Sequence, residues 1–188
     1  MNLEDAVLAV LAALNRLTVP YMVVGSFSSN TYGIPRATND VDFVVQVEAG
    51  GVRRIVEQLG PQFRLEPQVT FETITATTRY AVELTGTAFT VEFFLLSDDP
   101  HDKQRFARRQ EVELPGRRAV ATMPTAEDVI ITKLRWFKSA RRAKDFDDVR
   151  GIIAVRGDRL DWNYLHHWSD LHGTREILEQ SLASIPPA

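Results

Sequence analysis

The sequence predicts an α/β (α+β) protein whose C-terminal third is helical. Three observations support this fold class: apolar residues at helical spacing near the N-terminus, a strand-rich middle over residues 62–96, and good helix formers from residue 126 onward. The 188 residues are enough for one compact folding unit with a substantial core. We expect an α/β core over residues 1–122 with a helical region over residues 123–188 packed on it.

The first part of the chain alternates helices and strands. Leu3, Val7, Leu11 and Leu14 recur at helical spacing before Pro20, which predicts a helix over residues 3–17. Glycine and proline then mark turns between short apolar runs. The expected elements that follow are a strand over residues 21–24, a short helix over 26–32, a strand over 40–45 and a helix over 52–60.

The middle of the chain is expected to be mostly β-structure. Strands are predicted over residues 62–67, 69–76, 79–84 and 89–96, then a helix over 101–109 and a hairpin over 111–123 that turns at Pro115-Gly116. Thr125, three residues before Asp128, resembles a capping box and predicts that a helix over residues 126–138 starts there. Further helices are expected over residues 145–155, 161–170 and 174–184.

Composition narrows the class of protein. The chain has no cysteine, which excludes disulfides, thiolate metal sites and cysteine nucleophiles and is compatible with a cytoplasmic protein. No apolar run reaches the roughly 18 residues needed to span a membrane. The net charge is −3, yet residues 101–150 hold 13 Lys or Arg against 8 Asp or Glu. This basic segment could meet RNA or a nucleoside triphosphate, or could simply be a solvated helix face.

Two carboxylates interrupt the apolar strand predicted over residues 40–45. Asp40 and Asp42 are two residues apart, so their side chains point to one face about 6.6 Å apart. Their mutual repulsion favours a divalent cation between them, and Mg²⁺ prefers such oxygen ligands. Glu92, in another apolar strand, is the candidate for a third ligand, with Glu83 as a weaker one. The alternative is that the aspartates end a loop and Glu92 faces solvent.

A possible phosphate site precedes this strand. Gly25 permits close approach of a ligand to the backbone, and Ser26 stands at the start of the short helix, where free N–H groups favour an anion. A Gly-Ser pair is weak on its own. Followed on the next strand by Asp-x-Asp, it indicates an anion site joined to a cation site.

These residues resemble the nucleotidyltransferase-fold superfamily related to DNA polymerase beta. Three stretches, GIPRATNDVDFVV, MPTAEDVIITKLRWF and RRAKDFDDV, are similar to a bacterial group that includes the toxins of abortive-infection type IV toxin-antitoxin pairs. The resemblance spans roughly residues 20–155. It implies a mixed sheet flanked by helices with a C-terminal helical region, and Mg²⁺-dependent transfer of a nucleoside monophosphate from a nucleoside triphosphate to an acceptor hydroxyl.

The resemblance also implies roles for individual residues. Asp40 and Asp42 would bind two Mg²⁺ ions, and Glu92, where many relatives have Asp, would complete the second-ion site and help activate the acceptor. The implied nucleotide-binding residues are Gly25, Ser26, Lys133 and Asp145, together with Arg36 and Thr38 from the loop before the carboxylates. A loop-capping role is an equal alternative for Thr38. Asp147 and Asp148 are expected to cap or pair locally.

The sequence thus predicts a nucleotidyltransferase with an RNA, tRNA or protein acceptor, and a toxin paired with a cognate antitoxin is one form of it. Two alternatives stay open. The acceptor could be a small molecule such as an aminoglycoside, or the fold could bind a nucleotide or partner without turnover.

Overall fold

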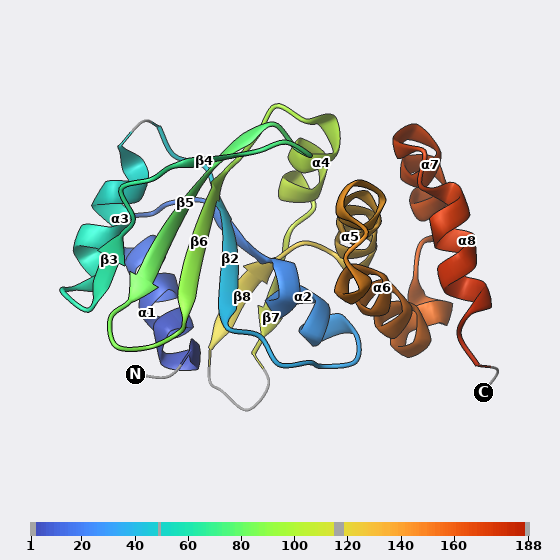
Figure 1. Ribbon diagram of the computed structural model, residues 1–188, viewed down its shortest axis with the longest axis horizontal. Helices are drawn as coiled ribbons and strands as arrows, with labels where there is room; N and C mark the ends of the chain where they lie inside the picture. Colours follow the sequence, from blue (N-terminus) through green and yellow to red (C-terminus); the bar gives the residue numbers. More distant parts are fainter. Residues whose placement is uncertain (1–2, 49, 115–118, 187–188) are drawn as a thin grey trace.

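The computed structural model describes residues 3–48, 50–114 and 119–186, which form a mixed β-sheet, a two-stranded ribbon and surrounding helices (Figure 1). The helices are α1 (Leu3–Arg16), α2 (Gly25–Tyr32), α3 (Gly51–Leu59), α4 (Pro100–Ala107), α5 (Ala126–Ala140), α6 (Ala143–Arg156), the short η1 (Gly157–Arg159), α7 (Trp162–His172) and α8 (Arg175–Ala183). The strands are β1 (Tyr21–Val24), β2 (Asp40–Val45), β3 (Phe63–Leu65), β4 (Thr70–Glu72), β5 (Thr77–Leu84), β6 (Thr90–Leu95), β7 (Gln110–Glu113) and β8 (Val120–Met123).

The main sheet is mixed, as the sequence predicts. Its strand order is β1-β2-β6-β5-β3, and β4 pairs with β5. Strands β2 and β6 run parallel, whereas β1 with β2 and β5 with β6 are antiparallel. The ribbon of β7 and β8 lies beside β1. The parallel pair places the starts of β2 and β6 at the same edge of the sheet.

Side-chain alternation along β2 explains why carboxylates interrupt an apolar strand. Val41, Phe43 and Val45 point into a hydrophobic core that includes residues of α1 and α3. The Phe43 ring stacks on Phe93 of β6 with ring centroids 5.6 Å apart. Asp40 and Asp42 therefore face the opposite side of the sheet, away from this core.

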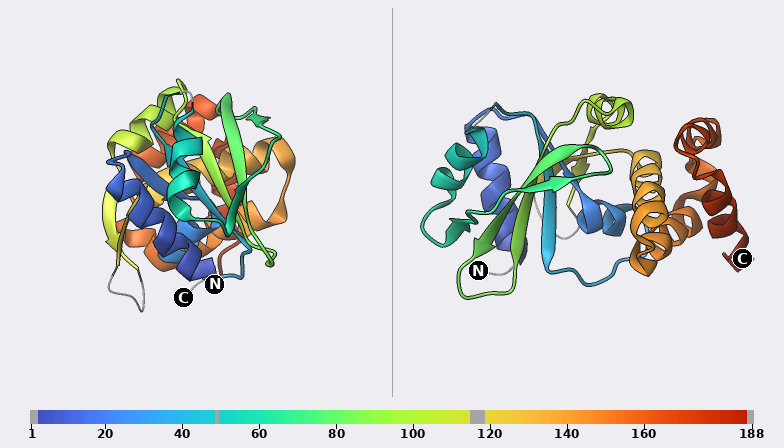
Figure 2. Two further views of the ribbon diagram at one scale, coloured as in Figure 1. Left: turned by 90° about the vertical axis from the view of Figure 1, so that its left-hand side faces the viewer. Right: turned by 45° about the horizontal axis from the view of Figure 1, so that its top comes forward.

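The helices form successive layers on the C-terminal side of the molecule. Figure 2 shows α5 and α6 standing between the sheet and the outermost pair, α7 and α8. Helix α2 contacts β1 and β2 as well as α5 and α6, so it joins the sheet to the C-terminal helices. A second hydrophobic cluster fills the space among α5, α6, α7 and α8. No helix in the described ranges has the length and apolar character that crossing a membrane requires.

The expected strand over residues 69–76 is too long. Only Thr70–Glu72 is a strand, and residues 73–76 form the turn into β5. The Glu72 carboxylate accepts hydrogen bonds from the backbone N–H groups of Ile74 and Thr75, so a side chain replaces the strand ladder here. Arg135 of α5 donates to the Ile74 carbonyl at 2.7 Å, which ties this turn to the helices.

The predicted start of α5 is confirmed. The Thr125 side chain accepts from the Asp128 backbone N–H, and its hydroxyl donates to the Asp128 carboxylate at 3.0 Å. Strands β7 and β8 pair as the predicted hairpin requires, while its turn at Pro115-Gly116 lies outside the described residues.

Helices α2 and α6 approach each other closely at Gly33. A Cβ atom placed on Gly33 would lie 2.8 Å from the Ile152 backbone nitrogen and 2.9 Å from the Gly151 carbonyl carbon. These neighbours are backbone atoms, so they cannot move aside as a flexible side chain can. The absence of a side chain at Gly33 therefore sets the distance between α2 and α6.

We predict that Gly33→Ala lowers the free energy of unfolding by about 1–3 kcal/mol, because the added methyl group forces the two helices apart. Gly157→Ala is the matched control, since its Cβ would meet nothing within 4 Å and its backbone is helical. That variant should leave stability unchanged or raise it by less than about 1 kcal/mol. Urea unfolding of both variants checks this, and equal midpoints would contradict the assignment.

Candidate active site

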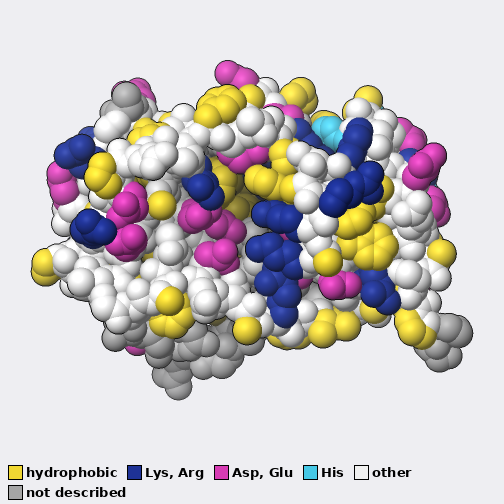
Figure 3. Space-filling view, in the orientation of Figure 1, with side chains coloured by type: hydrophobic (Ala, Val, Ile, Leu, Met, Phe, Trp, Pro, Cys, Tyr) yellow, Lys and Arg dark blue, Asp and Glu magenta, His cyan; other side chains and the backbone are white. Residues whose placement is uncertain are grey.

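A cavity of about 420 Å³ lies between the sheet and the C-terminal helices. The turn at Gly25 and the strand residues Asp40, Asp42 and Glu92 line one side, and Lys133 of α5 lines the other. Figure 3 shows a hollow with Asp and Glu side chains gathered on its sheet side and Lys and Arg side chains on its helix side. Acidic side chains therefore face basic side chains across the cavity.

The three predicted carboxylates lie on neighbouring strands. Asp42 stands directly opposite Glu92 in the β2–β6 register, and Asp40 is two residues earlier on the same face. Burial, and then the negative charges of Glu92 and Asp40, raise the pKa of Asp42 to about 7. The Thr38 hydroxyl donates to the Asp40 carboxylate. The surroundings of Asp42 thus disfavour its ionised form.

Gly25 is required by the position of Asp42. Its φ of +65° lies in the left-handed region, and a Cβ atom there would lie 1.8 Å from Asp42 Oδ2. The side chains of Ser28 and Ser29 donate to the Gly25 carbonyl, which holds the first turn of α2. The free N–H groups at the start of α2 consequently lie beside the carboxylates, and they form a site suited to an anion.

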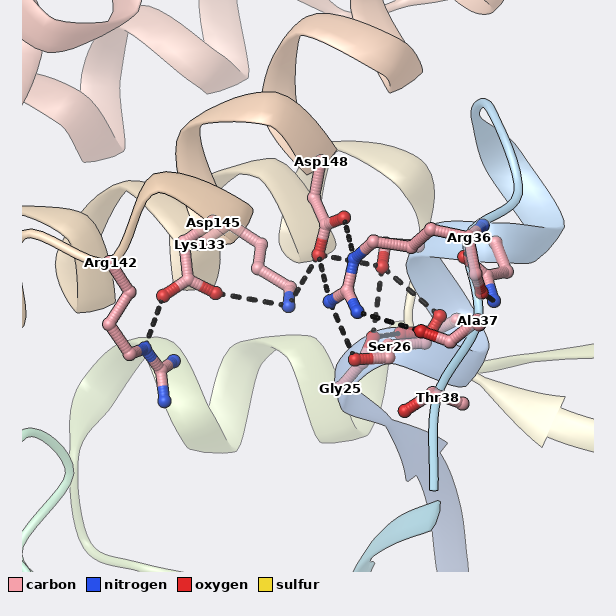
Figure 4. A network of polar contacts seen from close by, with 12 residues as sticks. Gly25, Ser26, Arg36, Ala37, Thr38, Lys133, Arg142, Asp145 and Asp148 are labelled. Atoms are coloured by element: carbon pink, nitrogen blue, oxygen red, sulfur yellow. Dashed lines mark hydrogen bonds and ion pairs between the residues drawn. The ribbon is translucent and has the colours of Figure 1, made fainter. Parts of the chain in front are cut away.

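A network of ion pairs builds the opposite side of the site (Figure 4). Asp148 of α6 receives Arg36 Nε at 2.7 Å and Lys133 Nζ at 2.7 Å. Arg36 also donates through Nη2 to Ser26 Oγ at 2.7 Å, and the Ser29 hydroxyl donates to Asp148 at 3.1 Å. Asp148 therefore fixes two cations beside the start of α2.

Asp145, one turn before Asp148, extends this network. It receives Lys133 Nζ at 3.1 Å and Arg142 Nε at 2.6 Å, and it is fully buried.

Burial alone would raise the pKa of Asp148, but the hydrogen bond from Arg36 and the charge of Lys133 outweigh it and lower this pKa. Asp148 is consequently ionised at neutral pH, as the bound cations require.

The structure places the residues proposed from the sequence around one cavity or directly behind it. Gly25, Ser26, Lys133 and the three carboxylates line the cavity, whereas Asp145 lies behind Lys133 and Thr38 behind Asp40. Arg36 reaches the start of α2 through Ser26. Glu83, the weaker candidate, is instead exposed and paired with Arg64 at 2.6 Å.

The expectation for Asp148 is wrong. Asp147 does pair locally, with Arg150 at 3.5 Å, but Asp148 bonds Arg36, which is 112 residues away in the sequence. The spacing of Asp145 and Asp148 was the available signal, since residues three apart share one helix face.

Two residues of the basic segment 101–150, Arg142 and Lys144, also line the cavity, although the sequence does not single them out as site residues. Lys144 is exposed and, among the described residues, makes no hydrogen bond or ion pair. Its charge nevertheless acts on Asp42, whose pKa it lowers in part. Lys144 is thus a cation open to a ligand in the cavity.

Glu92 does not lie as a metal ligand would. Arg79 Nη1 of β5 is 3.1 and 3.2 Å from its two carboxylate oxygens. Within the described part of the chain, no three His, Cys, Asp or Glu side chains are gathered so that they could hold a metal ion. The donor chemistry of Asp40 and Asp42 does fit a divalent cation, because both offer carboxylate oxygens on one face and the raised pKa of Asp42 marks an unmet counter-charge.

Comparisons with known proteins agree with this architecture. No protein-family model matches the sequence, and no curated protein matches it. Among solved structures, the solution structure of the antibiotic-resistance factor ANT(2'')-Ia has a TM-score of 0.62 at 15% identity, covering 97% of this chain and 98% of that one.

Two crystal structures extend this agreement. ANT(2'')-Ia in complex with adenylyl-2''-tobramycin has a TM-score of 0.63 at 14% identity, covering 92% and 97% of the two chains. An antigenic nucleotidyltransferase-like protein from Paracoccidioides brasiliensis has a TM-score of 0.56 at 19% identity, covering 97% and 93%. At these identities the likeness concerns the arrangement of helices and strands along nearly the whole chain, which therefore has the nucleotidyltransferase fold.

Proposed function

We propose that this protein is a nucleotidyltransferase that transfers a nucleoside monophosphate from a nucleoside triphosphate to an acceptor hydroxyl. The observation that carries the proposal is the cavity itself, which has Asp40 and Asp42 beside the turn at Gly25 on one side and Lys133 on the other. In this proposal residues 1–122 supply the carboxylates and the turn, and residues 123–188 supply Lys133, Arg142 and Lys144.

Each side of the cavity has a task in this reaction. The N–H groups at the start of α2, with Arg36 and Lys133, bind the β- and γ-phosphates and neutralise the pyrophosphate that leaves. Asp40 and Asp42 would hold Mg²⁺, which when bound polarises the α-phosphate. The acceptor oxygen bonds to the α-phosphorus while the bond to the bridging oxygen of the β-phosphate breaks. The hydroxyl proton passes to a base, for which Glu92 is the nearest carboxylate opposite Asp42.

The proposal also concerns which molecule carries the acceptor hydroxyl. The full-length correspondence with ANT(2'')-Ia, a structure of which contains adenylyl-2''-tobramycin, supports a small hydroxylated acceptor. The resemblance of the sequence to toxins of toxin-antitoxin pairs supports RNA, tRNA or a protein instead. The overall fold is compatible with both, and a direct assay separates them.

The reaction is tested with nucleoside triphosphates labelled at the α- or γ-phosphate, incubated with Mg²⁺ and with total RNA, cell protein or small metabolites. We expect α-label to enter one of these pools and γ-label to leave as pyrophosphate. The pool that gains label identifies the acceptor. Binding of nucleotide without incorporation in any pool would contradict transfer and support a non-catalytic binding module.

We predict that Asp42→Asn abolishes transfer while stabilising the fold. Loss of one cation-binding charge should lower the rate at least about a hundredfold. In metal-free buffer at pH 8 the thermal midpoint should rise, because a charge that is buried and also repelled by Glu92 and Asp40 is removed. The carboxyl pKa is raised from 3.8 to about 7 in the folded protein, so the penalty of ionisation grows from about pH 4 and is complete above about pH 7. The gain should therefore be smaller at pH 5, and a lower midpoint at pH 8 would contradict it.

We predict that Asp148→Asn raises the KM for the nucleoside triphosphate about tenfold, since a change of roughly 1.4 kcal/mol in binding corresponds to that factor. Asn cannot hold both Arg36 and Lys133 in place, so the phosphates lose positioned cations. Asp147→Asn is the control, because this neighbour is exposed and pairs only within α6. Steady-state kinetics with thermal unfolding check the pair, and an unchanged KM for Asp148→Asn in a folded protein would be evidence against the network's role.

A further inference from the structure

Arg79 is hydrogen-bonded to the carboxylate of Glu92, which a second metal ion would need as a ligand. Glu92 stands between two fully buried residues of β6, Val91 and Phe93, so its backbone is fixed within the sheet. Arg79 lies on the adjacent strand β5, and its Nη1 reaches both oxygens of Glu92, at 3.1 and 3.2 Å. A carboxylate engaged at both oxygens by one guanidinium nitrogen already has a positive partner.

The guanidinium of Arg79 is itself held in place. Its Nε donates to Thr70 Oγ1 at 2.8 Å, and Thr70 of β4 stands opposite Arg79 in the β4–β5 register. The strands on either side of β5, β4 and β6, thus each supply a hydrogen-bond partner to the Arg79 side chain. The Arg79 side chain is 37% exposed, but if it were to leave Glu92, the Thr70 bond would also have to break or turn.

Charge balance on the sheet side of the cavity points the same way. The sheet side holds three carboxylates, those of Asp40, Asp42 and Glu92, and Arg79 is paired with the last of them. The basic residues Arg36, Lys133 and Arg142 are paired with Asp148 and Asp145 on the helix side. Among the described residues, Asp40 and Asp42 are left without an ion pair, and Lys144 acts on Asp42 only through its charge; two carboxylates match one divalent cation.

We infer that the site takes one divalent cation, held by Asp40 and Asp42, and that Arg79 serves as the counter-charge of Glu92 in place of a second ion. This inference rests on the proposed function and replaces the two-ion arrangement expected from the sequence. Arg79 is then a positioning residue: it sets the orientation of Glu92 and leaves lone pairs of that carboxylate free for the acceptor hydroxyl.

The number of bound ions tests this inference. Mn²⁺ is titrated into the protein together with an α,β-methylene nucleoside triphosphate, which resists transfer, and free Mn²⁺ is counted by electron paramagnetic resonance. The protein is kept in excess so that all nucleotide is bound. We expect one Mn²⁺ for each bound nucleotide in the unaltered chain and two in Arg79→Met, because Glu92 then lacks its counter-charge.

Arg64→Met is the matched control. Arg64 is also an arginine of this sheet that pairs with a glutamate of β5, Glu83, but that pair is exposed and outside the cavity. The Arg64→Met protein should still bind one Mn²⁺ for each bound nucleotide. Two ions in the unaltered chain, or one ion in a folded Arg79→Met protein, would overturn the inference.

Glu92→Gln provides a second route if Arg79→Met does not fold. With one ion held by Asp40 and Asp42, this variant keeps its single Mn²⁺, whereas a two-ion site would lose one of two. Nucleotide binding is measured in the same samples by the shift of the thermal midpoint. A chain that binds no nucleotide at all contradicts the proposed function and this inference together, while two ions with bound nucleotide contradicts the inference alone.

Discussion

The burial of Asp42 opposite Glu92, on the parallel strands β2 and β6, is the constraint on which the rest of the site depends. Backbone pairing fixes both residues, so neither can retreat into solvent. The surroundings are arranged around these two carboxylates. Gly25 makes room for the Asp42 carboxylate, Arg79 pairs with Glu92, and the alternate residues of β2 anchor the strand in the core.

On the helix side of the cavity, by contrast, several positively charged side chains are partly buried. Asp145 and Asp148 pair with Lys133, Arg36 and Arg142. Buried ion pairs of this kind contribute little net stability, but removing one partner leaves a costly uncompensated charge. A ligand that carries both a divalent cation and a polyphosphate would satisfy both sides at once, which a simple anion or a simple cation would not.

The sequence predicts the local parts of this arrangement and misses the parts set by distant pairing. Asp40, Asp42 and the Gly25-Ser26 turn follow from spacing of two and from the start of a helix. Strand β4 ends early because Glu72 bonds the backbone of its own turn, a competition that strand propensity does not show.

Distant pairing is hidden from a single sequence. The pairing of Asp148 with Arg36 joins residues far apart in the chain, and that of Arg79 with Glu92 depends on strand register, which a shift of one residue would abolish.

The close packing at Gly33 has a consequence for how the cavity can open. Helices α2 and α6 touch backbone to backbone there, and Arg36 and Ser29 are bonded to Asp148 beside them. The start of α2 is therefore bonded to α6 while the same helix also contacts β1 and β2 of the sheet. A movement that widens the cavity must therefore either break these bonds to α6 or separate α2 from β1 and β2.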